Sequence, residues 1–294
     1  MHDLIQLGVD GVLIGMLYAL LAMGFVLVVK GSGVINFAHG ELVLVGAYVS
    51  SWTMSDIGIS PWLGLPLAMI ICAGIGMVIE RVALRPLINE SMLALVMATI
   101  ALGAILRGGT ALVWPEQSRE PVGVLPEGKY EILGFNVSAL TVWAAVGALV
   151  LLVMVGAFFS WTKLGLAMQA VADDRVAAQS LGINLRAVNA TSWALAGAVA
   201  SVAGFVWGAR IGIDGNLIVL GALIFPVVIL GGLESMLGVV FGGIVVGVVG
   251  SLSAGYLDAS LGGGFSSVSP LILLIVVLLV RPYGLFGRPD IERV

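Results

Sequence analysis

The sequence predicts an all-α polytopic membrane protein, and composition and glycine spacing are the observations behind this prediction. Its mean hydropathy is +1.14 and only 10% of its residues are charged, whereas roughly a quarter are charged in soluble domains. Glycine pairs with four-residue spacing, such as Gly11/Gly15 and Gly243/Gly247, allow helix backbones to approach closely in lipid. We therefore expect residues 1–294 to form a single transmembrane domain.

Apolar runs follow one another along the chain, and most approach the ~20 residues that a membrane-spanning helix needs. Two of them are expected to be broken or re-entrant, because Pro226 interrupts one and the polar segment 36–41 precedes another. We therefore predict eight or nine transmembrane helices. The runs cover residues 8–29, 42–52, 62–79, 91–114, 138–161, 188–209, 217–230, 236–252 and 267–280.

The basic residues predict the orientation, since cytoplasmic loops of membrane proteins are rich in Lys and Arg. With the N-terminus outside, the cytoplasmic set is Lys30, Arg81, Arg85, Lys163, Arg175, Arg186, Arg281, Arg288 and Arg293. Only Arg119, Lys129 and Arg210 then lie outside. We therefore expect an outside N-terminus, a cytoplasmic C-terminus, a periplasmic loop at 115–137 and a cytoplasmic loop at 162–187. No basic residue precedes the first apolar run, so we expect that run to be retained rather than cleaved as a signal peptide.

The polar loop 162–187 is the main candidate for contact with another protein. Good helix formers fill residues 163–180, and Gly182-Ile183-Asn184 is typical of a helix stop. Two interpretations stay open: a surface helix whose small alanines and few charges seat in a groove of a partner, or a solvated helix without a partner. The candidate contact residues are Ala172, Asp173, Asp174, Arg175, Ala178 and Gly182.

The polar segment 36–41 is a candidate lining of a transport pathway. Asn36 is expected to cap a helix that begins at Phe37. A half-helix that starts inside the membrane points free N–H groups and a positive dipole end at carboxylates, and His39 and Glu41 add polarity there. The alternative is a capped helix start at the cytoplasmic surface. His39 is not expected to bind a metal, since the sequence has only one other histidine.

Arg107 and Pro226 complete the candidate pathway residues. An arginine at the centre of a spanning helix costs about 2.5–3.5 kcal/mol on insertion scales, so Arg107 is expected to face protein or water. In one interpretation it pairs with a substrate carboxylate, and in the other it extends to the nearby outer surface. Pro226 removes a backbone donor from its helix.

The sequence carries no motif for catalysis. It has no H-E-x-x-H or G-x-S-x-G pattern, and Gly128-Lys129 is followed by Tyr130, which excludes a phosphate-binding P-loop. We therefore expect no enzymatic activity, no cofactor and no metal, and an energy-driven transporter would need its ATPase on another chain. The charges form no basic run, which argues against nucleic acid as a partner.

Five motifs occur in order along almost the whole chain. They are residues 34–42 (VINFAHGEL) with 46–48, 79–83 (IERVA) with 85–86, 165–173 (GLAMQAVAD) with 181–184, 230–232 (LGG) with 238 and 242–243, and 281–289 (RPYGLFGRP). Together they resemble the permease subunits of branched-chain amino-acid ABC importers, of the LivH type. Glu234 and Arg107 depart from the family pattern, as does the lack of a Lys in 217–226.

This resemblance implies a subunit of an ATP-driven importer in the bacterial inner membrane. Its partners would be a second, homologous LivM-like permease, two ABC ATPases and a periplasmic substrate-binding protein. The loop 162–187 would be the segment through which ATP binding moves the helices. The implied solutes are branched-chain or other hydrophobic amino acids.

Two alternatives to this function stay open. Related permeases carry urea, short-chain amides or aromatic acids on the same scaffold, and a family does not by itself fix a substrate. A passive solute channel could also use glycine-rich helices, although it would not need a docking loop. An intramembrane enzyme is disfavoured because the apolar runs contain no paired Asp, Ser/His or metal set.

Overall fold

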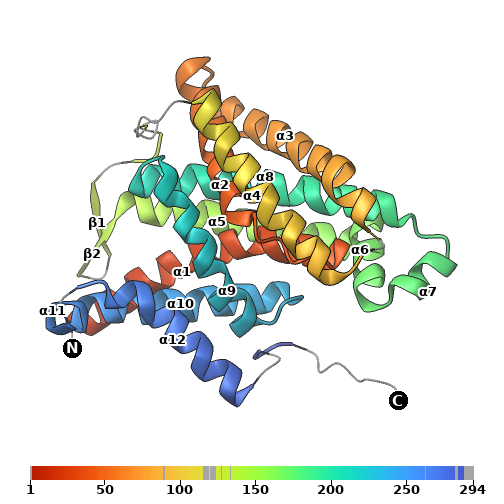
Figure 1. The fold of residues 1–294 in the computed structure, drawn as a ribbon. Helices are drawn as coiled ribbons and strands as arrows, with labels where there is room; N and C mark the ends of the chain where they lie inside the picture. The colour runs from red at the N-terminus through yellow and green to blue at the C-terminus, as the bar shows by residue number, and fades with distance from the viewer. Residues whose placement is uncertain are drawn as a thin grey trace.

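The chain forms a bundle of helices in a computed structural model (Figure 1). The structure describes residues 2–88, 90–114, 119, 124–126, 128–132, 134–261, 263–281 and 284–287. Within these residues, six helices are long and apolar enough to cross a membrane: His2–Ser32, Pro61–Leu87, Met92–Val113, Ala139–Trp161, Leu185–Ile211 and Met236–Ser260. Two shorter apolar helices span Gly215–Gly231 and Phe265–Val280. The protein is therefore a largely helical, polytopic membrane protein.

The elements are labelled in chain order. They are α1 (His2–Ser32), α2 (His39–Ser51), the π-helical turn η1 (Trp52–Asp56), α3 (Pro61–Ile79), the π-helical turn η2 (Glu80–Leu84), the 3₁₀ turn η3 (Arg85–Leu87), α4 (Met92–Val113), β1 (Lys129–Ile132), β2 (Phe135–Ser138), α5 (Ala139–Trp161), α6 (Lys163–Asp173), α7 (Arg175–Ser180), α8 (Leu185–Ile211), the 3₁₀ turn η4 (Gly215–Val219), α9 (Leu220–Gly231), α10 (Met236–Tyr256), α11 (Asp258–Leu261) and α12 (Phe265–Val280).

Each predicted apolar run contains a helix, but two runs are built differently from the others. The run 42–52 forms α2, which has only 13 residues, and continues into η1. The run 217–230 forms η4 and then α9, and α9 continues through Pro226. The prediction of a break at Pro226 is therefore wrong, because the irregular part of this segment is the 3₁₀ turn before Leu220. The total of eight or nine spans stays a prediction.

A β-hairpin departs from the all-α prediction. β1 and β2 pair antiparallel within the loop predicted at 115–137. The start of α1 holds this hairpin, since His2 Nε2 lies 3.1 Å from the Gly134 carbonyl and Gln6 Nε2 donates to the Asn136 carbonyl at 3.3 Å. Parts of the loop lie outside the described residues, namely 115–118, 120–123, 127 and 133.

Glycine contacts join α1 to α10. A Cβ atom added to Gly11 would lie 2.6 Å from Val248 Cα, and one added to Gly15 would lie 2.6 Å from Ile244 Cα. Gly11 and Gly15 have no side chain, so the backbone of α1 lies directly against that of α10. Such close packing is expected in a membrane, where no hydrophobic effect drives helices together. The predicted role of the four-residue glycine spacing in helix packing is thus confirmed for this pair.

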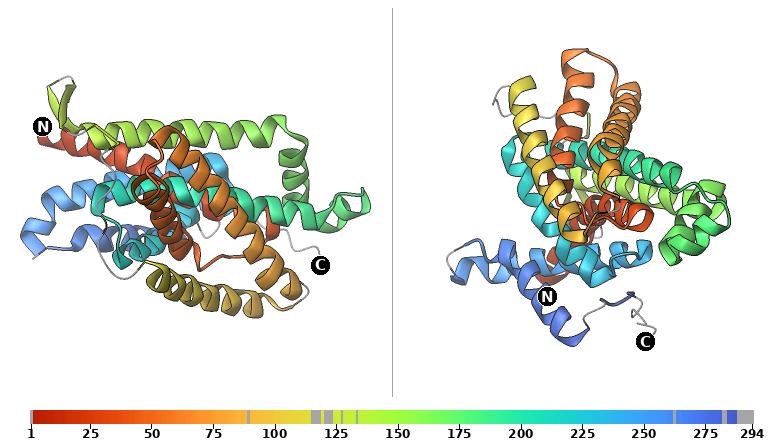
Figure 2. Two further views of the ribbon diagram at one scale, coloured as in Figure 1. Left: turned by 90° about the horizontal axis from the view of Figure 1, so that it is seen from above. Right: turned by 45° about the vertical axis from the view of Figure 1, so that its right-hand side comes forward.

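The bundle has two distinct ends (Figures 1 and 2). The N-terminus of α1, the β-hairpin and α11 gather at one end, here called the hairpin end. α6, α7 and the first turns of α8 project from the opposite end, here called the α7 end. α1 runs between the two ends with 31 residues, which is about 46 Å of α-helix. Arg288 and Arg293, two of the predicted cytoplasmic residues, lie outside the described residues.

Candidate functional site

The start of α2 lies deep inside the bundle. After α1 ends at Ser32, the chain turns back along α1, and His39 Nε2 comes within 3.1 Å of the Leu21 carbonyl. Leu21 precedes the end of α1 by eleven residues, which corresponds to about 16 Å along the helix. Every residue of α2 is buried. Of the two open interpretations of segment 36–41, this geometry matches a half-helix that begins within the bundle.

Asn36 does not cap α2 in the predicted way. The helix begins at His39 rather than Phe37, and its N-cap position is Ala38, without a side-chain cap. The Asn36 carboxamide instead accepts the Ala38 N–H at 3.0 Å, which forms a turn just before the helix. Asn36 Nδ2 and His39 Nδ1 are both buried and have no hydrogen-bond partner among the described residues. Two polar atoms at the start of α2 are thus available to other groups.

Glu41 and Arg107, which lie far apart in the sequence, form an ion pair. Arg107 Nη2 of α4 donates to Glu41 Oε1 of α2 at 3.0 Å, and the Glu41 side chain is 10% exposed whereas that of Arg107 is 60% exposed. Gly103 leaves space for the carboxylate, since a Cβ there would lie 3.2 Å from its carbon. Arg107 therefore has a partner within the chain, which neither interpretation of its sequence position included.

A pair of aromatic rings and one hydroxyl group also lie at the start of α2. Phe37 is 42% exposed, and its ring lies 5.3 Å from that of Phe225 on α9, next to the buried Pro226. The Phe37 N–H donates to Thr99 Oγ1 of α4 at 3.3 Å. Sequence reasoning missed Thr99 and Phe225, because residues so distant along the chain share no local pattern. The five predicted residues Asn36, Phe37, His39, Glu41 and Arg107 do gather at the start of α2, with Pro226 beside them.

The loop 162–187 contains two helices where one was predicted. α6 ends at Asp173, and Asp174 Oδ1 accepts the N–H groups of Val176 and Ala177 at 2.9 Å each. Asp174 is therefore the N-cap of α7, and a residue that caps a new helix has non-helical backbone angles. The predicted helix stop is present, since Gly182 has a φ of +83° just after α7.

The exposed side chains of this loop differ from the expected set. Ala178 is 2% exposed and points into the protein, so the idea that it faces a partner is wrong. Val176 and Leu181, which sequence reasoning missed, are 76% and 82% exposed. Their chemical type was a signal, because large apolar residues that form an exposed patch in a polar loop mark contact sites. Ala172 is half-buried, whereas Asp173, Asp174 and Gly182 are exposed.

Arg175 turns inward rather than toward solvent. Its Nη1 donates to the backbone carbonyl of Ser32, the last residue of α1, at 2.9 Å. Burial lowers the pKa of the Arg175 guanidinium, although an arginine stays charged in proteins. The predicted contact residues therefore divide into an exposed group and an inward group made of Arg175 and Ala178.

No group of three or more His, Cys, Asp and Glu side chains that could hold a metal ion occurs in the part of the chain that the structure describes. The polar groups at the start of α2 and in the α6–α7 loop are suited to hydrogen bonding and ion pairing.

Comparisons with known proteins place the chain among transport proteins. The chain is 35% identical to the high-affinity branched-chain amino acid transport system permease protein LivH of Salmonella typhimurium, covering 97% of this chain and 96% of the relative. It is 31% identical to BraD of Pseudomonas aeruginosa, covering 100% and 98%. It is also 26% identical to LivM of Escherichia coli, covering 97% of this chain and 71% of that protein.

Among solved structures, the chain is similar to a chain of PsaBC from Streptococcus pneumoniae in complex with Fab, with a TM-score of 0.47, 13% identity and coverage of 93% and 91%. The model of the family "branched-chain amino acid transport system / permease component" matches residues 8–280. The expected resemblance and the expected role as a transport subunit rather than an enzyme are thereby confirmed. The chain belongs to the family of branched-chain amino acid transport system permease components.

Proposed function

We propose that this permease carries branched-chain or other hydrophobic amino acids into the cell as part of an ATP-driven importer in the bacterial inner membrane. The observation that carries the proposal is the Glu41–Arg107 ion pair at the buried start of α2. A free amino acid bears one carboxylate and one ammonium group. An ion pair that opens offers a cation and an anion to these two groups.

The surroundings of the ion pair fit an apolar amino-acid side chain. The half-exposed Phe37 ring and the Phe225 ring lie beside the start of α2, and apolar solutes bind where aromatic side chains line a site. Asn36 Nδ2 adds an unused donor for a carboxylate oxygen. Urea and simple amides are neutral and carry no charges that could replace those of the pair, so the amino acid is the preferred solute.

The α7 end is the proposed docking surface for an ATPase on the cytoplasmic side. Val176 and Leu181 supply apolar contact area, and Asp173 and Asp174, which are also exposed, precede them in the chain. Buried apolar anchors carry most of the affinity in protein interfaces, whereas charges at the rim set orientation. The cytoplasmic assignment is supported by the basic residues at the ends of α1 and α3, which share this end of the bundle (Figure 1).

The remaining proposed partners are inferred from the relatives. LivH and LivM are two kinds of homologous permease, and the chain is similar to both, which supports a pair of permeases in the membrane. A substrate-binding protein is proposed to dock at the hairpin end, on the periplasmic side. The exposed apolar faces of α3, α4 and α5 would then meet lipid or the second permease.

The test is a reconstituted importer in proteoliposomes, with the partner permease, the ATPases and the binding protein. Uptake and ATP hydrolysis are measured with L-leucine, urea, acetamide and benzoate as separate solutes. We expect L-leucine alone to stimulate both. Stimulation by urea, acetamide or benzoate instead would assign a different solute, and uptake without ATP or binding protein would reveal a passive channel.

A second test addresses docking. Leu181→Asp places a charge on the proposed apolar contact and is expected to weaken ATPase co-purification by at least tenfold, since a hot-spot residue contributes about 2 kcal/mol or more. Leu164→Asp, at an exposed position of α6 in the same loop, serves as the matched control. Equal co-purification of the two variants would exclude docking through α7.

A further inference from the structure

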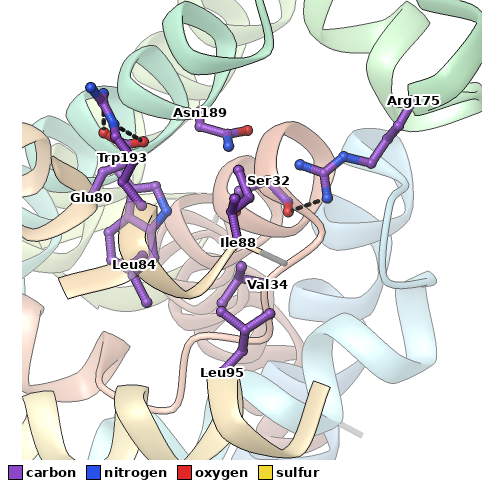
Figure 3. A pocket seen from close by; sticks show the side chains of 10 residues that line it. Ser32, Val34, Glu80, Leu84, Ile88, Leu95, Arg175, Asn189 and Trp193 are labelled. Carbon is purple, nitrogen blue, oxygen red and sulfur yellow. Dashed lines mark hydrogen bonds and ion pairs between the residues drawn. The ribbon is translucent and has the colours of Figure 1, made fainter. Parts of the chain in front are cut away.

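A small cavity with several polar groups on its wall lies at the α7 end, between the loop 162–187 and the bundle. It has a volume of about 30 Å³ and is lined by parts of α1, η2, η3, α4, α7 and α8 (Figure 3). One water molecule needs about 10–15 Å³ of such space, so the cavity is too small for a transported solute. What distinguishes it is the set of polar groups on its wall, which includes Ser32, Arg175, Asn189 and Trp193.

Arg175 crosses this cavity to hold the end of α1. Its bond to the Ser32 carbonyl satisfies one of the acceptors that the last turn of any helix leaves free, and it places a cation at the negative end of the helix dipole. Gly33 comes next in the chain with a φ of +68°, and a Cβ there would lie 3.3 Å from Arg175 Nη1. The guanidinium thus lies against Gly33, where the chain turns from α1 toward α2. Gly33 precedes Ala38, the N-cap position of α2, by five residues.

A second acceptor for Arg175 opens on the same cavity. Asn189 Oδ1 of α8 is buried, at 3% exposure of the residue, and has no hydrogen-bond partner among the described residues. Glu80 also lines the cavity, but its two carboxylate oxygens already accept from Arg85 at 3.2 and 2.7 Å. A buried acceptor without a partner is costly. Asn189 Oδ1 is therefore an unpartnered acceptor on the wall of the cavity that Arg175 also lines.

We propose that Arg175 is a two-position latch: it holds Ser32 in this structure and transfers to Asn189 when α7 moves. The transfer frees the end of α1 and the segment 33–38, which positions Asn36 and His39 at the start of α2. Movement of the docked ATPase is thereby passed to the candidate solute site, an inference that rests on the proposed function. Arg175 acts through the backbone and is a positioning residue, since it does not touch the solute.

Two substitutions at Asn189 separate the two positions of the latch. Asn189→Leu removes the acceptor and keeps the volume, so Arg175 stays on Ser32. Asn189→Asp supplies a charged acceptor, which binds a guanidinium more strongly, so Arg175 moves away from Ser32. Arg186→Gln, at an exposed position of the same loop, is the matched control that removes a cation without touching the cavity.

The first readout is amide hydrogen exchange of residues 33–38 in the permease without its ATPases. We expect roughly tenfold faster exchange in Asn189→Asp, as for the loss of one hydrogen bond to a charged group, and wild-type exchange in Asn189→Leu and Arg186→Gln. Wild-type exchange in Asn189→Asp overturns the latch. If Asn189→Leu does not fold, Asn189→Asp and Arg186→Gln still decide the result.

The second readout is leucine uptake per ATP hydrolysed in the reconstituted importer. We expect both Asn189 variants to hydrolyse ATP while uptake falls about tenfold or more, with Arg186→Gln unchanged. Normal coupling in both Asn189 variants overturns the latch even though the importer works. Failure of the wild-type importer to take up leucine would instead overturn the proposed function, and hydrogen exchange would still test the latch by itself.

Discussion

Glu41 and Arg107 are unequal partners, because one is buried and the other is exposed. The Glu41 side chain is 10% exposed and that of Arg107 is 60% exposed. A buried carboxylate needs its counter-charge, since an uncompensated charge in the interior is strongly unfavourable. An exposed guanidinium can instead be solvated. The two residues therefore respond differently to the loss of the other.

Arg107→Gln is expected to destabilise the permease by about 3 kcal/mol, because it leaves Glu41 buried without a counter-charge. Glu41→Gln should cost less, since the exposed Arg107 keeps its solvent contacts. The double variant should recover most of the loss. Thermal unfolding of the purified variants in one detergent, combined as a double-mutant cycle, measures the coupling. A larger loss for Glu41→Gln than for Arg107→Gln would contradict the assigned roles.

Chemical type alone identified both members of this pair as unusual, but not as partners. An arginine inside an apolar run and a glutamate beside a histidine are rare and conspicuous in a membrane sequence. Their contact depends on how α2 and α4 pack. The two residues are 66 positions apart, so no local sequence pattern predicts the contact. The same limit applies to the contact between Phe37 and Thr99.

Helix packing in the bundle is decided where glycine permits two backbones to meet. α1 and α10 are in contact through Gly11, Gly15, Gly243 and Gly247. Not every glycine of α10 serves this purpose, since a Cβ at Gly250 would meet nothing within 4 Å. The four-residue spacing correctly predicted that the contact glycines pack against another helix. Only the structure shows that Gly250 does not.

Gly247→Ala is expected to lower stability by about 1–3 kcal/mol, as overpacking does in a filled interior. Its Cβ would lie 2.6 Å from Gly15 Cα. Gly250→Ala is the matched control and is expected to be neutral or to stabilise by up to about 1 kcal/mol, because glycine within a helix is entropically unfavourable. Thermal unfolding midpoints of the two variants make the comparison. Equal midpoints would show that the α1–α10 contact can relax.

The short helix α7 depends on its cap. Asp174→Ala removes the acceptor for the first N–H groups of α7 and is expected to cost about 1 kcal/mol, which weakens a helix of six residues and the ATPase coupling that depends on it. Asp174→Asn keeps the cap and removes the charge. ATP-dependent uptake should survive in Asp174→Asn and fall in Asp174→Ala. Equal loss in both variants would make the charge, rather than the cap, the important property.

The split between α6 and α7 had a signal in the sequence. Aspartate is among the residues preferred at helix N-caps, and Asp174 stands between two stretches of good helix formers. The helical propensity of its neighbours favoured one continuous helix instead. The burial of Ala178 had no such signal. The sequence of a short helix without a clear apolar face does not predict which side packs against the protein.

At the scale of the whole molecule, the positions of the apolar helices could be predicted because hydrophobicity is a local property of the chain. The depth at which α2 begins could not, since it depends on the return of the chain along α1. The hairpin also escaped prediction, because most of its loop is polar and its support comes from His2 and Gln6 at the far end of the sequence.

Cysteine labelling tests the proposed orientation of the whole molecule. The single native cysteine, Cys72, is fully buried, so it provides little background. We expect Gln179→Cys, at the α7 end, to react with a membrane-impermeant maleimide only after the cells are opened. Glu131→Cys, at the hairpin end, should react in intact cells. The reverse pattern would invert the proposed orientation and remove the basis for ATPase docking at α7.

The π-helical turn η2 has a consequence for how this chain can vary among its relatives. A π-turn contains one residue more than the α-helical turn it replaces, and in η2 it brings the buried Glu80 opposite Arg85, five positions later. Deleting one residue there would restore the α-helix and rotate the residues after the turn by about 100° relative to α3. Arg85 would leave Glu80, and a carboxylate on the wall of the small cavity would lose its partner. A one-residue gap at this point of an alignment would therefore mark relatives in which the α7 end is packed differently.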